Sequence, residues 1–149
     1  MAYQLRYIDD RLHDIHAKTA RGVDDIQNYA TSRANNEAVE RYENELTRRT
    51  SSLKSDINNQ LDSFRYDITN KRPSQNDPNY EQNMKRYGDF ITHGNDGIES
   101  MKGRFAQLFS KLFEVVKKIV KWVRDHLSEI ISAICDIFGN IILPLLGFM

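Results

Sequence analysis

The sequence of 149 residues contains one cysteine, one tryptophan and three prolines. A single cysteine excludes an intramolecular disulfide framework and a zinc site built from cysteines. The first proline is Pro73, so no proline interrupts the first half of the chain. No segment has the alternation of apolar and polar residues that is typical of a strand, and we therefore expect an all-α protein.

Recognisable catalytic motifs are also missing. The chain has no glycine-rich phosphate loop, nucleophile elbow or HExxH pattern. Its best polar cluster is Asp9, His13 and His16, which share a helical spacing but lack a further ligand motif. Most clusters of this kind are solvated surface. We expect no enzyme activity, no catalytic residue, no metal, no cofactor and no small-molecule substrate.

The charges balance overall but are unevenly distributed. Residues 1–100 carry an excess of three acidic side chains, and residues 101–149 carry an excess of three basic ones. The basic part is also the apolar part, whereas a nucleic-acid binder would be expected to gather its basic residues on a polar face. We therefore expect an anionic lipid membrane as a partner, and no nucleic acid.

Residues 1–70 form a polar region with the pattern of coiled-coil-like helices. Apolar or small residues recur every three or four positions from Leu5 to Ile68, which is the spacing of one helical face. The region is either an extended rod of about 100 Å or a helical hairpin that breaks within residues 28–37. An 11-residue repeat in its second half predicts a packing seam of a homo-oligomer. The seam residues are Tyr42, Leu46, Leu53, Ile57, Leu61, Phe64 and Ile68.

Residues 71–97 are predicted to be a linker that contains a short helix over residues 79–92. Pro73 and Pro78 lie among polar turn residues and end the long region before them. The sequence "THGNDG" at 92–97 combines glycine with Asn-Asp-Gly turn chemistry, which is typical of a helix end. A break is therefore expected before residue 98.

Residues 98–149 are predicted to form a long C-terminal helix that changes from basic and amphipathic to apolar. Residues 104–125 combine a wide apolar face with lysines, as helices in a membrane interface do, although a core helix with a solvated lysine face has the same pattern. The predicted lipid headgroup-binding residues are Lys111, Lys117, Lys118, Lys121 and Arg124.

The last part of this region, residues 130–149, has 14 apolar residues of 20, and Asp136 is its one charge. Its insertion into a bilayer is therefore marginal. Four polar residues share one face, which would line the lumen of an oligomer or face solvent in a bundle: Glu129, Ser132, Asp136 and Asn140. The predicted membrane-contacting residues are Phe105, Leu108, Phe109, Leu112, Phe113, Val116, Ile119, Trp122, Ile130, Ile134, Ile137, Phe138 and Ile141.

Three classes of function fit these patterns. The leading prediction is a membrane-active protein that is soluble when made, oligomerises, and inserts its C-terminal helix to permeabilise (pore-forming) or remodel a bilayer. The alternatives are a coiled-coil adaptor anchored by a C-terminal transmembrane helix, and a soluble self-assembling bundle or filament subunit. Because the first residues lack the apolar core of a signal peptide, we expect synthesis in the cytosol followed by membrane insertion or non-classical release.

Overall fold

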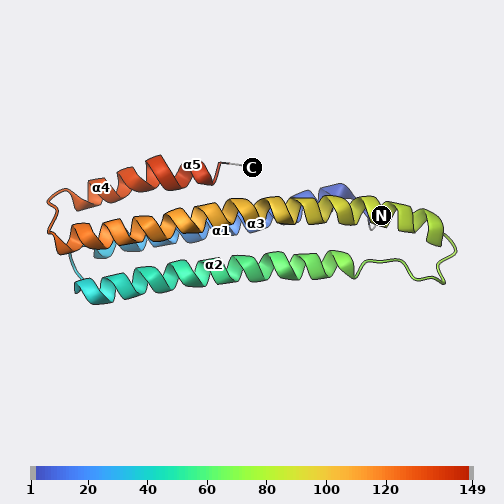
Figure 1. Ribbon diagram of the computed structural model, residues 1–149, viewed down its shortest axis with the longest axis horizontal. Coiled ribbons are helices and arrows are strands. Elements are labelled where there is room, and N and C mark those ends of the chain that lie inside the picture. The colour runs from blue at the N-terminus through green and yellow to red at the C-terminus, as the bar shows by residue number, and fades with distance from the viewer. Residues whose placement is uncertain (1–2, 148–149) are drawn as a thin grey trace.

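A computed structural model describes residues 3–147, which fold into an up-and-down bundle of helices (Figure 1). No strand occurs within residues 3–147, which confirms the expected all-α class. The outermost residues of the predicted regions, 1–2 and 148–149, lie outside the described part. The elements are α1 (Leu5–Arg33), α2 (Val39–Thr69), α3 (Tyr80–Arg124), α4 (Ile130–Ile137), a π-helical turn η1 (Phe138–Ile142) and α5 (Leu143–Leu145).

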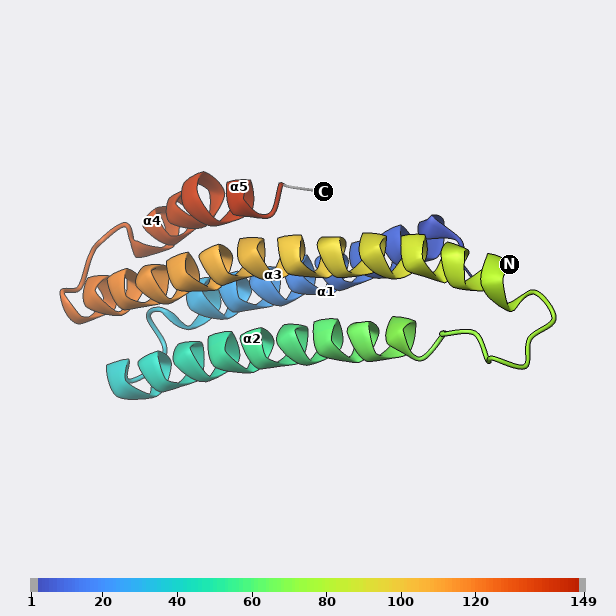
Figure 2. The ribbon, with the colours of Figure 1, turned by 45° about the vertical axis from the view of Figure 1, so that its right-hand side comes forward.

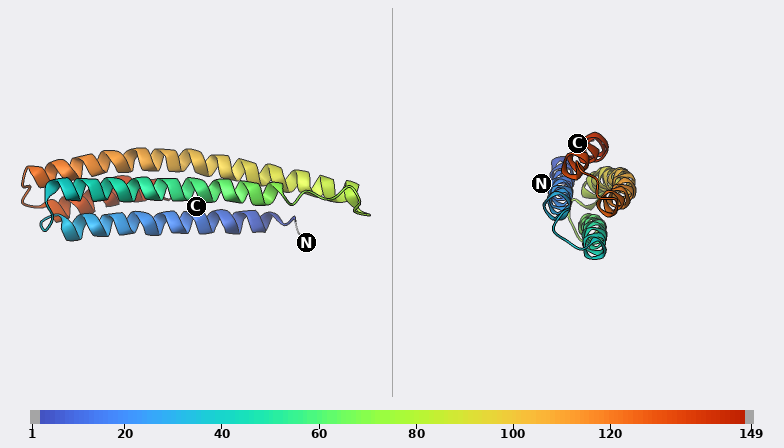
Figure 3. Two further views of the ribbon diagram at one scale, coloured as in Figure 1. Left: turned by 90° about the horizontal axis from the view of Figure 1, so that it is seen from below. Right: turned by 90° about the vertical axis from the view of Figure 1, so that its left-hand side faces the viewer.

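The helices α1 and α3 lie side by side and run in the same direction. On one side they are covered by α2, and on the opposite side by α4, η1 and α5, which we call the C-terminal segment, residues 130–147 (Figure 3). This segment is short and covers only the end of the bundle near Arg124 (Figure 2). The molecule therefore has a four-helix half and a three-helix half. The four-helix half contains α1 from His16, which lies at the Leu146 carbonyl, and α3 from Arg104, which lines a groove with Leu145 and Gly147.

The region predicted as a rod or a hairpin is a hairpin. The turn between α1 and α2 lies at residues 34–38 and overlaps residues 28–37, where the sequence predicts the break. The residues of the predicted oligomer seam line the core that α2 forms with α1 and α3: all are buried except Leu53, which is half-buried. In this fold they are covered by the same chain, and their pairing between copies stays a prediction.

The predicted break at residues 92–97 is wrong, because α3 runs through it without interruption. The short helix over 79–92 is therefore only the first part of α3. Two glycines of the "THGNDG" sequence have a different use: a Cβ on Gly94 would lie 2.4 Å from Ile68 Cδ1, and one on Gly97 would lie 2.6 Å from Leu12 Cδ1. They allow α3 to approach its neighbours closely, which a turn-based interpretation of glycine misses.

The long apolar C-terminal helix is also wrong, because α3 ends at Arg124 and the chain reverses. The end is a Schellman motif: Leu127 N donates to Trp122 O at 3.0 Å, and His126 N donates to Val123 O at 3.2 Å. His126 has the left-handed backbone of this motif, with φ of 57°. Glycine is the usual residue there, so a histidine gave no signal for the stop.

Candidate membrane-contacting surface

The apolar residues predicted to contact a membrane lie mostly inside the four-helix half. Those of α3 are buried except Phe113 and Trp122, which are half-buried. Those of the C-terminal segment are buried except Ile141, which is exposed. The two groups belong to one core, so α3 and the C-terminal segment shelter much of each other's apolar surface.

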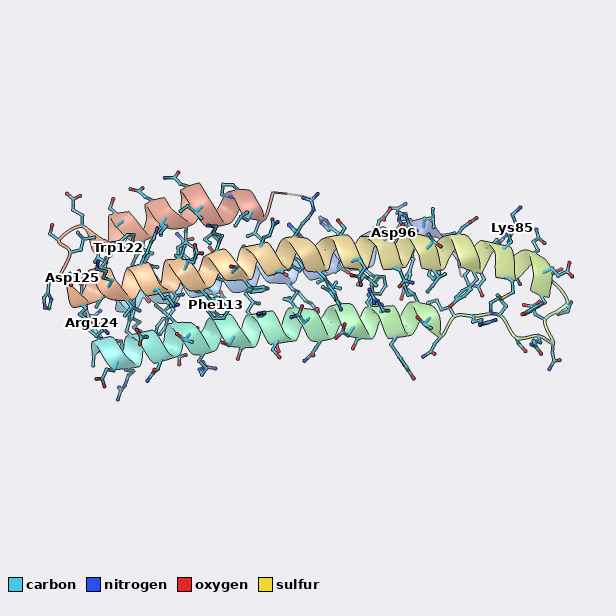
Figure 4. The ribbon with its side chains drawn as sticks, in the orientation of Figure 1. Lys85, Asp96, Phe113, Trp122, Arg124 and Asp125 are labelled. Atoms are coloured by element: carbon cyan, nitrogen blue, oxygen red, sulfur yellow. The ribbon has the colours of Figure 1, made fainter. Side chains whose placement is uncertain are left out.

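The cations predicted to bind lipid headgroups are all exposed on the outer face of α3. They are Lys111, Lys117, Lys118, Lys121 and Arg124. Lys111 Nζ lies 3.3 Å from Glu114 Oε2, an exposed pair within one helix. Figure 4 places Trp122, Arg124 and Asp125 at the end of α3 where the chain turns toward the C-terminal segment. Positive charge therefore lies on the exposed side of the part of α3 whose other side is the sheltered apolar face.

The four residues of the predicted polar stripe, Glu129, Ser132, Asp136 and Asn140, are exposed on the outside of the bundle. This placement is the one expected for the solvent side of a bundle helix. Their role in the lumen of an oligomer stays a prediction, since it requires a different arrangement of several copies.

A second exposed line, which the sequence analysis missed, runs along the same segment. We call it the outer stripe, and its members are spaced by four residues: Ile131, Cys135, Gly139 and Leu143. Ile131 is 48% exposed and Leu143 51%. The segment thus has apolar residues on its outer surface as well as on its buried face. This line could not be recognised in the sequence, because apolar residues occur on several sides of the helix and the sequence does not tell which side is covered.

The C-terminal segment is held to the bundle mainly by apolar packing. Its own side chains Ile134, Phe138 and Ile142 are fully buried against the bundle. A polar link is also present: His16 Nε2 and the backbone oxygen of Leu146 are 2.6 Å apart. The π-helical turn at Phe138–Ile142 interrupts the segment. Such turns are rare in proteins, and those that occur are often found at functional sites.

One edge of α3 brings basic side chains next to this segment. Arg104 and Gln107 line a small groove together with Pro144, Leu145 and Gly147 of the C-terminal end. Residues seven apart on a helix lie almost on one line, so Lys111 and Lys118 continue the line of Arg104 along the segment. Exposed basic residues of α3 therefore follow the side of α3 that carries Arg104.

Other predicted features take ordinary structural roles. Within residues 3–147, no helix is both long enough and apolar enough to cross a membrane. His93 Nε2 lies 2.7 Å from Asp9 Oδ1, and His16 faces the Leu146 carbonyl, so the cluster near the N-terminus is divided between two partners. The described residues bring together no group of three side chains suited to a metal ion.

Comparison of the chain with known protein families, with curated proteins and with solved structures finds no match.

Proposed function

We propose that this protein is a membrane-active helical bundle that binds an anionic bilayer, oligomerises on it, and opens its four-helix half to permeabilise or remodel the membrane. The observation that carries the proposal is the second half of α3, where a continuous buried face of phenylalanines and branched aliphatic residues lies opposite exposed Lys117 and Lys121. A helix of this composition is stable in a bundle core and in a lipid interface.

The exchange between the two environments is physically reasonable because hydrophobic burial is non-directional and roughly proportional to the apolar area removed from water. Acyl chains can replace the C-terminal segment and α1 as the cover of α3. Long lysine side chains can meanwhile keep their charged ends at the headgroups. Residues 101–124 would then lie in the plane of the membrane over about 36 Å.

The C-terminal segment is the element that we expect to leave first. It packs on α1 and α3 from one side and has no cover on its outer side. Peripheral elements with few neighbours open at a lower free energy than the core of a bundle. Its departure uncovers Leu108, Val115 and Ile119 on α3, which are buried in the closed bundle.

A liposome experiment tests this proposal. The chain, purified without detergent, is expected to co-sediment with vesicles rich in phosphatidylserine and to release an entrapped dye, and to do neither with neutral vesicles. The double variant Lys117→Glu/Lys121→Glu should bind at least about tenfold more weakly, because each basic residue near an anionic surface contributes about 1 kcal/mol. Both side chains are exposed, so the fold should be retained.

The matched control is Lys54→Glu/Lys85→Glu, which makes the same change of net charge at exposed positions outside this surface. It should bind and leak nearly as the wild type does. Equal loss in both double variants would point to net charge alone and contradict the assignment to α3. A wild-type protein that leaves the dye inside anionic vesicles would sink the proposed function.

A further inference from the structure

We infer that the hydrogen bond between His16 and the backbone oxygen of Leu146 is a latch, which holds the C-terminal segment on the bundle and limits how fast the segment is released. The inference rests on the proposed function, in which this segment leaves first, and adds to it the contact that controls the departure. The latch acts in the closed bundle, where it can be measured without a membrane, so the latch and the proposed function can fail separately.

The two ends of the C-terminal segment are attached in different ways. Its first residue, Ile130, follows the corner after Arg124, so the covalent chain keeps that end close to the end of α3. The far end, at α5, lies over the middle of the bundle (Figure 1). There His16 Nε2 of α1 lies 2.6 Å from the Leu146 oxygen and connects residues that are 130 positions apart in the sequence. A segment that departs from its far end must break this contact.

The far end of the segment is contacted by two helices. Arg104 of α3 lines a groove with Leu145 and Gly147, and His16 reaches the residue between them from α1. The Leu146 side chain is 7% exposed, so the hydrogen bond lies beside a buried group and is partly shielded from water. A hydrogen bond in such surroundings is electrostatically stronger than one in open water.

Apolar packing becomes weaker toward this far end. Ile134, Phe138 and Ile142 are fully buried, whereas Leu143 is 51% exposed and Leu145 is half-buried. The free energy gained from burial is roughly proportional to the apolar area removed from water, so these last residues gain less from it. The hydrogen bond to His16 therefore acts where apolar packing contributes least.

The helical backbone is also weaker just before the latch. Pro144 has no N–H group, so it cannot bond to the carbonyl of Asn140, four residues earlier. The Leu143 N–H donates to the Phe138 oxygen, five residues earlier, in the π-helical turn. A helix that lacks a regular hydrogen bond opens more easily at that position. Residues 143–147 can therefore detach before Phe138 does, and His16 holds them where the detachment begins.

The variant that tests the latch is His16→Ala, which removes the side chain that contacts Leu146. The net contribution of one hydrogen bond corresponds to a change of about two- to tenfold in an equilibrium constant, so hydrogen exchange in residues 130–147 should accelerate by this factor. Residues 57–68 of α2 should keep their protection, because the rest of the bundle stays closed. His16→Gln, whose side-chain amide can also donate, should restore slow exchange.

The matched control is His13→Ala, which removes an exposed histidine about one turn earlier on α1. Exchange of the C-terminal segment should be the same in this variant as in the wild type. Equal acceleration in His13→Ala and His16→Ala would show a general effect of losing a histidine from α1 and would overturn the latch.

Phosphatidylserine vesicles that contain a dye test the control of membrane activity. Because the latch limits the release of the segment, His16→Ala should shorten the delay before dye release by about the factor by which it accelerates exchange. Its co-sedimentation with the vesicles should equal that of the wild type, because Lys117 and Lys121 remain exposed on α3. His16→Gln should return the delay to that of the wild type.

Each combination of results has a definite meaning. Accelerated exchange that is confined to the C-terminal segment and reversed in His16→Gln supports the latch. If the wild type then releases no dye, only the proposed permeabilising function fails. Unchanged exchange in His16→Ala overturns the latch and leaves the proposed function intact. Acceleration that extends to residues 57–68 also overturns it, as does an unchanged delay in a protein that does release dye.

Discussion

The two halves of the bundle are held together by different kinds of contact. In the three-helix half and at its border, charged side chains connect different helices: Arg65 pairs with Glu99, and Lys102 Nζ lies 2.6 Å from Asp62 Oδ1. Tyr87 also donates to the Thr69 carbonyl at 2.9 Å. Such contacts depend on direction and register, so they define how these helices are aligned.

In the four-helix half, α1 and α2 are likewise joined by a directional contact, the buried hydrogen bond of 2.5 Å that Tyr42 donates to the Ala30 carbonyl. An ion cluster of this half, in which Arg48 and Arg49 contact Glu45, lies within α2, and Arg49 also places its guanidinium over the ring of Tyr29 on α1, 4.4 Å from the ring centroid.

The C-terminal segment depends more on apolar packing. Three side chains of the C-terminal segment, Ile134, Phe138 and Ile142, are fully buried in the core. Apolar packing can be replaced by another apolar environment more readily than a directional contact can. For this reason we assign the mobile role to the C-terminal segment.

The largest effects are expected when one buried phenylalanine ring is removed from each half of the bundle. Phe64→Ala should lower the global free energy of unfolding by about 3–5 kcal/mol, because Phe64 is fully buried between the helices of the three-helix half. Phe138→Ala should instead act locally. Hydrogen exchange would accelerate in residues 130–146, while residues 57–68 keep their protection.

Urea unfolding measured with hydrogen exchange checks both variants. An equal loss of protection throughout the molecule in both would mean that the C-terminal segment unfolds only with the whole bundle. The two halves would then not differ in the way described.

A smaller effect is expected from the glycines of α3. Gly94→Ala should destabilise the protein by about 1–3 kcal/mol, because the new Cβ would overlap Ile68 Cδ1 and meet Ile8 Cδ1 at 3.0 Å. The control Gly103→Ala meets no atom within 4 Å and should stabilise α3 by about 0.5–1 kcal/mol. Opposite signs in thermal unfolding are the expected result, and a stabilising Gly94→Ala would refute the close approach of α3.

The smallest effect concerns pH. Hydrogen bonds from Arg48 and then Arg49 lower the pKa of Glu45 to about 2, from 4.5. Because the pKa is lowered in the folded state, the stabilisation is present above pH 4.5 and is lost as pH falls from there toward 2. Glu45→Gln should remove this part of the acid dependence and lower the melting temperature at pH 7 by no more than about 2 °C.

Thermal unfolding of Glu45→Gln and the wild type between pH 2 and pH 7 provides the measurement. Hydrogen exchange of the C-terminal segment should be the same in both proteins, since Glu45 pairs with Arg48 and Arg49, which lie on α2 and not in that segment. Faster exchange of the segment in the variant would contradict this expectation.

Much of the fold could be predicted because periodicity directly reports a buried face. The core positions Ile8, Ile15, Leu46 and Leu61 follow the spacing of three and four that the sequence displays, and all of them are buried. The exposed lysines of α3 were visible for the same reason. The errors arose where one residue type has two uses. Gly94 predicted a turn and instead permits close packing.

The corner after Arg124 was not predictable in this way. His126 adopts the left-handed backbone there although histidine is no strong stop signal. Apolar residues continue on both sides of the corner, so the pattern favours one continuous helix. Only the chance to pack the C-terminal segment against α1 and α3 makes the reversal favourable.

The sequence alone determined that the chain is helical, which faces of α1, α2 and α3 are apolar, and that positive charge accompanies the apolar C-terminal region, because these properties follow from residue types and their spacing. Tertiary structure decided where the helices end and which apolar faces are covered. A helix with apolar residues on several sides can bury only some of them, and the helices that it meets determine which ones. For this reason Phe138 is buried and Leu143, five residues later, is exposed on the outer stripe.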